Sequence, residues 1–212
     1  MKYFFNILPT LLVGAKMTIQ LTAVSVLFGT IIGLFVGIAR VSRNRLIRWL
    51  ATAYVEVIRG TPLLVQLYIV YFGLVNVLDL GQYWSAILAF SINSGGYVAE
   101  IVRGGIQSID KGQMEAARSL GMTYGQAMRY IILPQAVKRI LPPLGNEFII
   151  LMKDSSLVSI IALEELTRKG QIILTRNYKA FETYGAVAIV YLVMTLALSQ
   201  LVRYMERRLE TE

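Results

Sequence analysis

Long apolar stretches alternate along the chain with short polar connections that are rich in lysine and arginine. An apolar run of about 20 residues is long enough to cross the hydrocarbon core of a bilayer as a helix. The pattern therefore predicts an all-α polytopic membrane protein, with one transmembrane domain over residues 1–212. The five predicted spans cover roughly residues 14–39, 50–75, 83–102, 138–157 and 183–202.

The first span is preceded by an apolar segment, residues 1–12, that carries an early lysine and Pro9. We expect a short interfacial helix that is retained in the mature protein, because no small-x-small cleavage site of a signal peptide follows it. Small and hydroxylated residues then recur in the first span: Thr18, Thr22, Ser25, Gly29, Gly33 and Gly37. Glycines four residues apart let two helix backbones approach closely in a membrane. We favour helix packing for this face over a polar substrate path.

Composition agrees with a membrane location, since 56% of the residues are hydrophobic and the mean hydropathy is +0.58. The net charge of +8 does not indicate nucleic-acid binding, because the cations flank the apolar spans and form no continuous face. The chain contains neither cysteine nor histidine. This excludes disulfides, thiolate chemistry and Cys/His metal sites, and we expect no metal site.

The distribution of the 21 lysine and arginine residues predicts how the spans are oriented. Most of them follow the first span, lie between residues 103 and 139, or follow the last span. Cytoplasmic segments carry an excess of cations, so the amino terminus is predicted outside and the carboxyl terminus in the cytoplasm. The connection over residues 159–182 then lies outside, where it is polar enough to form an exposed helix and loop that contacts a soluble partner.

The second span contains two charged residues and a proline. Glu56 and Arg59 are three positions apart on one helical face, so we expect them to pair and to lower the cost of burying both charges. Pro62 lacks a backbone N–H and should kink or break the helix. We assign this region to packing and gating and not to substrate contact.

The third span is interrupted at mid-membrane depth by Asn93-Ser94-Gly95-Gly96. Broken helices at the midplane are where transporters expose backbone groups to substrate, so this segment is a candidate substrate site. Close packing against a neighbouring helix is the alternative interpretation.

The fourth span buries Glu147, Lys153 and Asp154 in an otherwise apolar run. A charge at the centre of a bilayer costs on the order of 3 kcal/mol, so these residues are predicted to be functional. Glu147 and Asp154 are seven positions apart, so they share a helix face and lie about 10 Å from each other along the axis. The structural alternative is that Asp154 pairs with Lys153 or with another helix and only holds the fold, and a purely structural role is also open for Glu147.

These side chains suit a free amino acid, which needs an anionic partner for its ammonium group and donors for its carboxylate. The candidate substrate-binding residues are Glu147, Asp154, Asn93, Ser94, Gln66 and Ser155. Two carboxylates on one face favour a solute with an additional positive charge, such as arginine, lysine, ornithine or histidine.

The longest stretch that reads as soluble and helical runs from Glu115 to Pro134, within a predicted cytoplasmic loop over residues 104–135. Its first part is rich in helix formers, and Gly121 lies where a first helix ends. Apolar residues recur at helical spacing, so one stripe is predicted to face a partner: Ala116, Ala117, Leu120 and Tyr124.

This stretch, with Glu115-Ala116-Ala117, Gly121 and then Ile131-x-Leu133-Pro134, resembles the EAA loop of ATP-binding-cassette (ABC) import permeases. The resemblance extends in order over nearly the whole chain to the polar amino acid permeases. It rests on three further motifs: Arg59-Gly60-Thr61-Pro62-Leu63-Leu64-Val65-Gln66, Glu100-Ile101-Val102-Arg103-Gly104-Gly105-Ile106 and Lys153-Asp154-Ser155-Ser156-Leu157.

The resemblance implies the fold of a type I (MetI-like) importer permease in a bacterial inner membrane. It implies that Glu115, Ala116, Ala117 and Gly121 couple the chain to two ABC ATPase subunits, and that an extracytoplasmic binding protein delivers the solute. No G-x-x-x-x-G-K-[ST] motif occurs, so the chain is not expected to be an enzyme, and ATP and magnesium are expected on the partner ATPase.

Five helices rarely enclose a polar path, so we also expect a second permease chain, as a homodimer or with a close homologue. The predicted function is import of polar amino acids, with basic ones favoured. A glutamine or general polar amino acid permease is the first alternative, and an ion-coupled secondary transporter is the second.

Overall fold

The computed structural model describes residues 2–210, so residues 1, 211 and 212 of the predicted domain lie outside the described range. Regular secondary structure in residues 2–210 is entirely helical. The α-helices are α1 (Lys2–Arg40), α2 (Arg45–Gly60), α3 (Leu63–Tyr68), α4 (Gly81–Gln107), α5 (Lys111–Ser119), α6 (Tyr124–Ala127), α7 (Leu133–Asp154), α8 (Leu166–Asn177) and α9 (Ala180–Glu210). Two π-helical turns and a 3-10 helix extend them: η1 (Ile69–Gly73), η2 (Met128–Ile132) and η3 (Ser155–Ile161).

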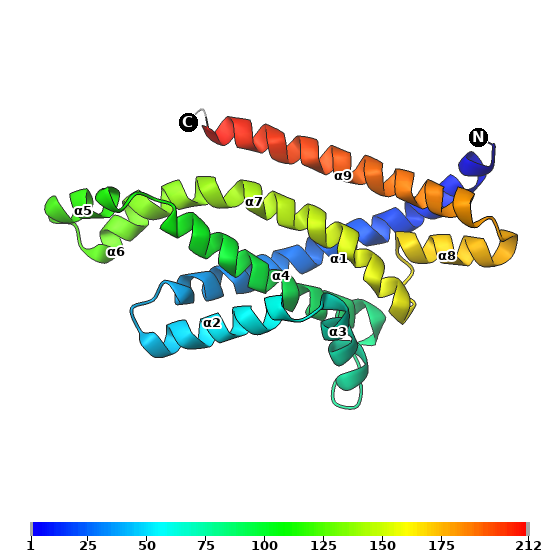
Figure 1. The fold of residues 1–212 in the computed structure, drawn as a ribbon, viewed down its shortest axis with the longest axis horizontal. Helices are drawn as coiled ribbons and strands as arrows, with labels where there is room; N and C mark the ends of the chain where they lie inside the picture. The colour runs from blue at the N-terminus through cyan, green and yellow to red at the C-terminus, as the bar shows by residue number, and fades with distance from the viewer. Residues whose placement is uncertain (1, 211–212) are drawn as a thin grey trace.

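The molecule is elongated, and α1, α2, α4, α7 and α9 run roughly along its long axis (Figure 1). The hairpin of α5 and α6 lies at one end. The amino terminus and α8 lie at the other end, so α1 and α9 both run toward the hairpin end (Figure 1). The termini of the long helices therefore gather at two opposite ends, as expected for a bundle that spans a membrane.

Three of the described helices are long and apolar enough to cross a bilayer, namely those over residues 3–40, 81–107 and 180–208. Helices α2 and α3–η1 meet this condition only as a pair, and they are bent by 102° at the break between them. This confirms the break predicted at Pro62, whose φ of −64° and ψ of 136° leave the helical region. Helix α7, which contains the predicted fourth span, does not meet the condition because it carries several charges.

The separate interfacial helix predicted for residues 1–12 is not present, because α1 is continuous from Lys2 through Pro9 to Arg40. The amino-terminal part of α1 is held by packing, since Ile7 and Leu11 lie in a buried cluster with residues of α8 and α9. Loss of one backbone hydrogen bond at a proline is tolerated where neighbouring helices hold both sides of it.

The predicted glycine seam of α1 is confirmed as a packing surface against α4. A Cβ added to Gly33 would lie 2.4 Å from the Val98 Cβ, and a Cβ added to Gly29 would lie 2.8 Å from the Ser94 Cβ. Thr18 and Thr22 are also buried and bond within the protein, so this face of α1 is not a substrate path.

The predicted interruption of the third span is wrong, since α4 is an unbroken helix from Gly81 to Gln107. Its glycines allow neighbouring helices to approach. A Cβ on Gly95 would lie 2.7 Å from Cγ2 of Ile32, and one on Gly96 would lie 2.8 Å from Cγ2 of Ile58. The alternative of close packing therefore holds for this segment.

The connection between α7 and α8 is less exposed than the sequence predicts. Glu165 is fully buried and caps α8, where it accepts hydrogen bonds from the backbone N–H groups of Thr167 and Arg168. The Tyr191 hydroxyl of α9 also donates to Glu165, at 2.9 Å. This carboxylate therefore joins α8 to α9, and the exposed polarity lies in the rest of the segment.

Candidate functional site

A cavity of about 530 Å³ lies between the α2–α3 bend, α4 and α7. One wall is the bend itself, the 102° break between Gly60 and Leu63. Its lining combines apolar residues with both signs of charge: Arg59, Gly60, Thr61, Pro62, Leu63, Leu64, Asn93, Tyr97, Glu147, Ile150, Leu151, Asp154 and Leu157. A concave site with a few convergent polar groups is the usual form of a small-molecule site.

The α7 wall supplies the two carboxylates that the sequence predicts. Glu147 is 5% exposed, Asp154 is partly buried, and both line the cavity. In the described part of the chain, neither carboxylate has a lysine or arginine nitrogen within 4.0 Å. The predicted alternative, an ion pair of Asp154 with Lys153, is therefore absent from this arrangement. Both groups remain available to a cationic solute.

The other predicted polar residues divide into two groups. Asn93 lines the cavity, whereas Ser94, Gln66 and Ser155 do not. Ser94 is fully buried on α4 and its side chain lies beside Glu147. Ser155 is fully buried and donates to the carbonyl of Met152 at 2.7 Å.

Gln66 does not line the cavity but has a structural role next to it. Its amide Nε2 donates to the carbonyl of Ile58 at 2.8 Å and to Oγ1 of Thr61 at 2.8 Å. Its Oε1 accepts a hydrogen bond from Asn93 Nδ2 at 3.0 Å. Gln66 thus fixes the bend between α2 and α3 and fastens it to α4, which positions Asn93 at the cavity.

Two cavity residues, Arg59 and Tyr97, were not among the predicted site residues. The predicted pair of Glu56 with Arg59 is wrong: the Arg59 guanidinium lies 3.8 Å from Glu100 on α4, and Glu56 is exposed. The same guanidinium lies over the Tyr97 ring, 5.4 Å from its centroid. Local spacing favoured Glu56, but packing of α2 on α4 brings a distant carboxylate closer.

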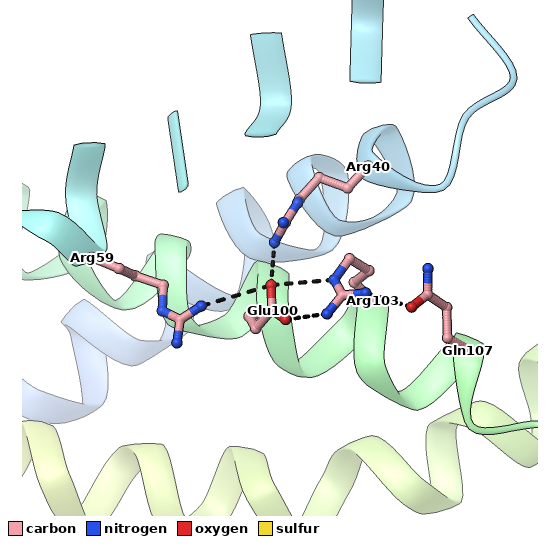
Figure 2. A network of polar contacts seen from close by, with 5 residues as sticks. All are labelled: Arg40, Arg59, Glu100, Arg103 and Gln107. Atoms are coloured by element: carbon pink, nitrogen blue, oxygen red, sulfur yellow. Dashed lines mark hydrogen bonds and ion pairs between the residues drawn. The ribbon is translucent and has the colours of Figure 1, made fainter. Parts of the chain in front are cut away.

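Glu100 is the centre of a polar network at the edge of the cavity (Figure 2). Arg40, at the end of α1, and Arg103, on α4, both bind its carboxylate directly, and Arg103 contacts both oxygens. Arg103 also donates to the Gln107 side chain. The network therefore joins α1, α2 and α4 around one carboxylate.

At the far end of α4, the loop predicted to couple forms a helical hairpin. Helix α5 begins at the N-cap Asp110, whose carboxylate accepts a hydrogen bond from the Gly112 N–H at 2.6 Å. It ends at Ser119 with the C-cap Leu120, just before Gly121, which has a φ of +83° and terminates the helix as predicted. The Met122 N–H bonds to the Ala117 carbonyl at 3.2 Å and the Gly121 N–H bonds to the Arg118 carbonyl at 3.1 Å. This pairing is the Schellman motif, and it requires a left-handed residue at Gly121.

The second half of the hairpin begins with a capping box between Thr123 and Gln126. The predicted apolar stripe is divided in the structure. Ala116 and Leu120 are exposed, and Leu120 is exposed by 84%, whereas Ala117 is buried. Glu115 is also exposed, so Glu115 and Ala116 of α5 and the following Leu120 all lie on the exposed surface of the hairpin.

The hairpin is attached to the helices that form the cavity walls. Its second half continues through η2 directly into α7. Arg139 of α7 donates to the carbonyl of Ser108 at the end of α4, and Arg43 lies over the Tyr124 ring, 4.7 Å from its centroid. Buried apolar residues of α4, of the connection to α5, of η2 and of α7 form one cluster next to it: Val98, Val102, Ile106, Ile109, Ile132, Ala136 and Ile140.

The sequence and the fold are both similar to those of known transport proteins. The model of a family described as binding-protein-dependent transport system inner membrane component matches residues 29–211. The glutamine transport system permease protein GlnP of Escherichia coli (strain K12) is 44% identical over 206 residues, which are 96% of this chain and 94% of the relative. The arginine transport system permease protein ArtQ of Bacillus subtilis (strain 168) is 40% identical with the same coverage.

A solved structure agrees with these relatives. The chain in a crystal structure of an amino acid ABC transporter with histidines superimposes with a TM-score of 0.91. It is 49% identical in sequence, and the match covers 94% of each chain.

Proposed function

The chain belongs to the family of binding-protein-dependent transport system inner membrane components, and we propose that it forms the pathway by which basic amino acids enter the cell. It is a permease subunit of an ABC importer for amino acids, and a partner ATPase carries out ATP hydrolysis. The proposal concerns which amino acids pass. A secondary transporter is not favoured, because the family works with an ATPase.

The observation that carries the proposal is the pair of carboxylates on α7. Glu147 and Asp154 face one cavity, seven residues apart, and neither has a cation within 4.0 Å among the described residues. Burying a carboxylate that has no direct ion pair is costly, and a cationic solute offsets that cost when it binds. The solved relative that contains histidines, which is 49% identical, supports the same choice.

Glutamine is the second candidate. The Asn93 amide lines the cavity beside the carboxylates, and an amide pairs well with the side-chain amide of glutamine. The permease GlnP of Escherichia coli, 44% identical, is a glutamine system. Glutamine needs a carboxylate only for its α-ammonium group, so it leaves one of the two acidic residues without a cation.

We further propose five membrane spans, with the amino terminus outside and the carboxyl terminus in the cytoplasm of a bacterial cell. Helix α7 is then the fourth span despite its charges, because it packs alongside α4 and α9 and turns Glu147 and Asp154 toward the cavity. The hairpin of α5 and α6 lies on the cytoplasmic side, and α8 lies at the outer surface.

The proposed assembly has two permease chains, as a homodimer, and two ATPase subunits that bind ATP and magnesium. An extracytoplasmic binding protein delivers the amino acid, in keeping with the description of the family. The exposed surface of α5 and the turn at Gly121 are the proposed contact with the ATPase. Closure of the ATPase subunits on ATP would move the α5–α6 hairpins of the two permease chains together. This movement would switch the cavity between its inward-open and outward-open states.

The test is uptake by the complete complex in proteoliposomes with the Glu147→Gln substitution. This change keeps the size of the side chain and removes its charge, so we expect arginine uptake to fall roughly tenfold or more. Asp154→Asn, made in the same way, tests the preference for basic amino acids, because it should reduce arginine uptake by a similar factor while glutamine uptake is largely retained. Glu164→Gln is the matched control, because Glu164 is exposed in the connection before α8 and pairs with Lys169. Equal uptake of arginine by wild type and Glu147→Gln would exclude Glu147 from the site.

A further inference from the structure

We propose that Arg59 binds the α-carboxylate of the transported amino acid. The inference rests on the proposed function, in which the cavity between α2, α4 and α7 holds the amino acid. Arg59 lines the same cavity as Glu147 and Asp154 and supplies its positive charge. A zwitterionic α-amino acid needs both signs of charge, and the two acidic residues satisfy only its cationic groups.

The charge balance of the network shows that Arg59 is not needed to neutralise Glu100. Three guanidinium groups surround this one carboxylate (Figure 2). Arg103 binds both of its oxygens, and Arg40 binds Oε2 as well. Arg59 reaches Oε2 only at 3.8 Å, which is beyond hydrogen-bond distance.

Arg59 is therefore a cation with donors to spare. Its side chain is 41% exposed, compared with 11% for Arg40 and 29% for Arg103. A guanidinium group carries five N–H donors in a planar fork that matches a carboxylate. An incoming carboxylate would compensate the excess positive charge at this edge of the cavity.

The surroundings hold the guanidinium in place before a ligand arrives. It lies over the Tyr97 ring, 5.4 Å from the centroid, and Tyr97 also lines the cavity. Cation–π contact and the weak attraction of Glu100 restrict the long side chain, so less conformational entropy is lost when it binds.

The register of α4 and α7 orders the charges along the cavity. Helix α4 runs toward the hairpin end and α7 runs away from it (Figure 1). Tyr97, which Arg59 covers, is three residues closer to the hairpin than Ser94, and Ser94 lies beside Glu147. Asp154 is seven residues further from the hairpin end. With a rise of 1.5 Å per residue, the level of Tyr97 and Arg59 is about 5 Å from Glu147 along the helix axes, on the side of the hairpin. Asp154 is about 10 Å from Glu147 along α7, in the opposite direction.

This order matches an extended basic amino acid. The carboxylate would lie against Arg59 and the neighbouring α-ammonium group would reach Glu147. A long cationic side chain would then point toward Asp154. Arg59 would then distinguish amino acids from simple amines, because only amino acids carry the α-carboxylate. Asp154 would distinguish among amino acids by the charge of their side chains.

The experiment compares arginine with agmatine, which is arginine without its carboxylate. Binding of each is measured by calorimetry to the permease–ATPase complex in nanodiscs without the binding protein, so that only the cavity is probed. We expect wild type to bind arginine more tightly than agmatine. In Arg59→Gln, arginine should bind roughly ten- to a hundredfold more weakly, with agmatine binding unchanged or stronger. The preference would then be lost.

The control is Arg45→Gln, which removes the same charge from the other end of α2, where Arg45 is exposed and outside the cavity. It should keep the wild-type ratio of the two affinities. If Arg59→Gln fails to assemble, Arg59→Lys replaces it and should reduce the ratio less but in the same direction. A ratio that equals the wild-type value in the Arg59 variant overturns the inference, and so does equal weakening of both ligands.

Failure of the proposed specificity would give a different result. If the wild-type complex binds glutamine but not arginine, the proposed specificity for basic amino acids is wrong. The proposed role of Arg59 can still be tested. The same comparison is then made with glutamine and 4-aminobutanamide, which is glutamine without its carboxylate. Arg59→Gln should again remove the preference for the carboxylate form, and an unchanged ratio would again overturn the inference.

Discussion

Replacing Gly121 by alanine changes one backbone position in the turn between α5 and α6. Gly121 has a φ of +83°, and an added Cβ would meet no atom within 4 Å. Steric overlap with other residues is therefore excluded, so the cost is conformational. The left-handed region costs an L-residue with a Cβ about 1–2 kcal/mol.

This cost acts on the folded turn alone, so the turn would open more often than in wild type. A penalty of 1–2 kcal/mol reduces the population of the native turn by roughly five- to thirtyfold relative to the opened forms. Gly125 provides the matched control, since it lies in α6 and an added Cβ there also meets nothing within 4 Å. Because its backbone is helical, Gly125→Ala should be neutral or stabilise the hairpin by up to about 1 kcal/mol.

The assay is the affinity of the permease for its ATPase subunit, together with amino acid uptake by the reconstituted complex. Gly121→Ala should weaken both, and Gly121→Asn should lie between it and wild type, because asparagine tolerates the left-handed region better. Gly125→Ala should behave as wild type. Full coupling in Gly121→Ala would show that the hairpin does not depend on this turn, and the assignment of the hairpin as the ATPase contact would lose its main support.

Two other substitutions test the packing around the cavity. Gly33→Ala would place a Cβ 2.4 Å from the buried Cβ of Val98, so α1 and α4 must separate. We expect the free energy of unfolding to fall by about 1–3 kcal/mol in a thermal unfolding assay. Gly104→Ala is the control, because an added Cβ at Gly104 would meet no atom within 4 Å. An unchanged melting temperature in Gly33→Ala would contradict the seam. Gln66→Met would leave the Asn93 amide without its acceptor, which costs about 1–3 kcal/mol, and should reduce uptake of all amino acids equally. A change in selectivity instead would place Gln66 in contact with the solute.

The hairpin was predictable because its signals are local. A glycine after a run of helix formers and a threonine three residues before a glutamine specify where one helix ends and the next begins. Gly121 has the predicted role in the structure, and Thr123, for which no role was predicted, forms the capping box of the next helix with Gln126. Which face of α5 is buried was not predictable, since Ala116 and Ala117 are identical residues and only the contact with the second half of the hairpin distinguishes them.

The polar residues of the cavity were only partly predictable. Glu147 and Asp154 stand out because charges are rare in an apolar helix, and both line the cavity. Gln66 and Asn93 stand out equally, yet they bond to each other across a helix contact that the sequence does not specify. Arg59 was misassigned because helical spacing offered Glu56, whereas the actual carboxylate, Glu100, lies far along the chain and is brought close only by tertiary packing.

The arrangement also explains how a force on the hairpin would reach the cavity. Helix α5 follows α4 after a short connection and η2 continues into α7, so the hairpin is joined to the two helices that carry Asn93 and Glu147. The bend between α2 and α3 is attached to α4 by the hydrogen bond between Gln66 and Asn93, by the packing of Ile58 on Gly96 and by the loose contact of Arg59 with Glu100. Displacement of the hairpin would therefore move α4 and α7 directly, and it would reach the third wall through these contacts. Of the polar contacts the Arg59–Glu100 pair is the weakest because it is not a hydrogen bond, so the distance between the Arg59 guanidinium and Glu147 is the dimension of the cavity that should change most when the hairpin moves.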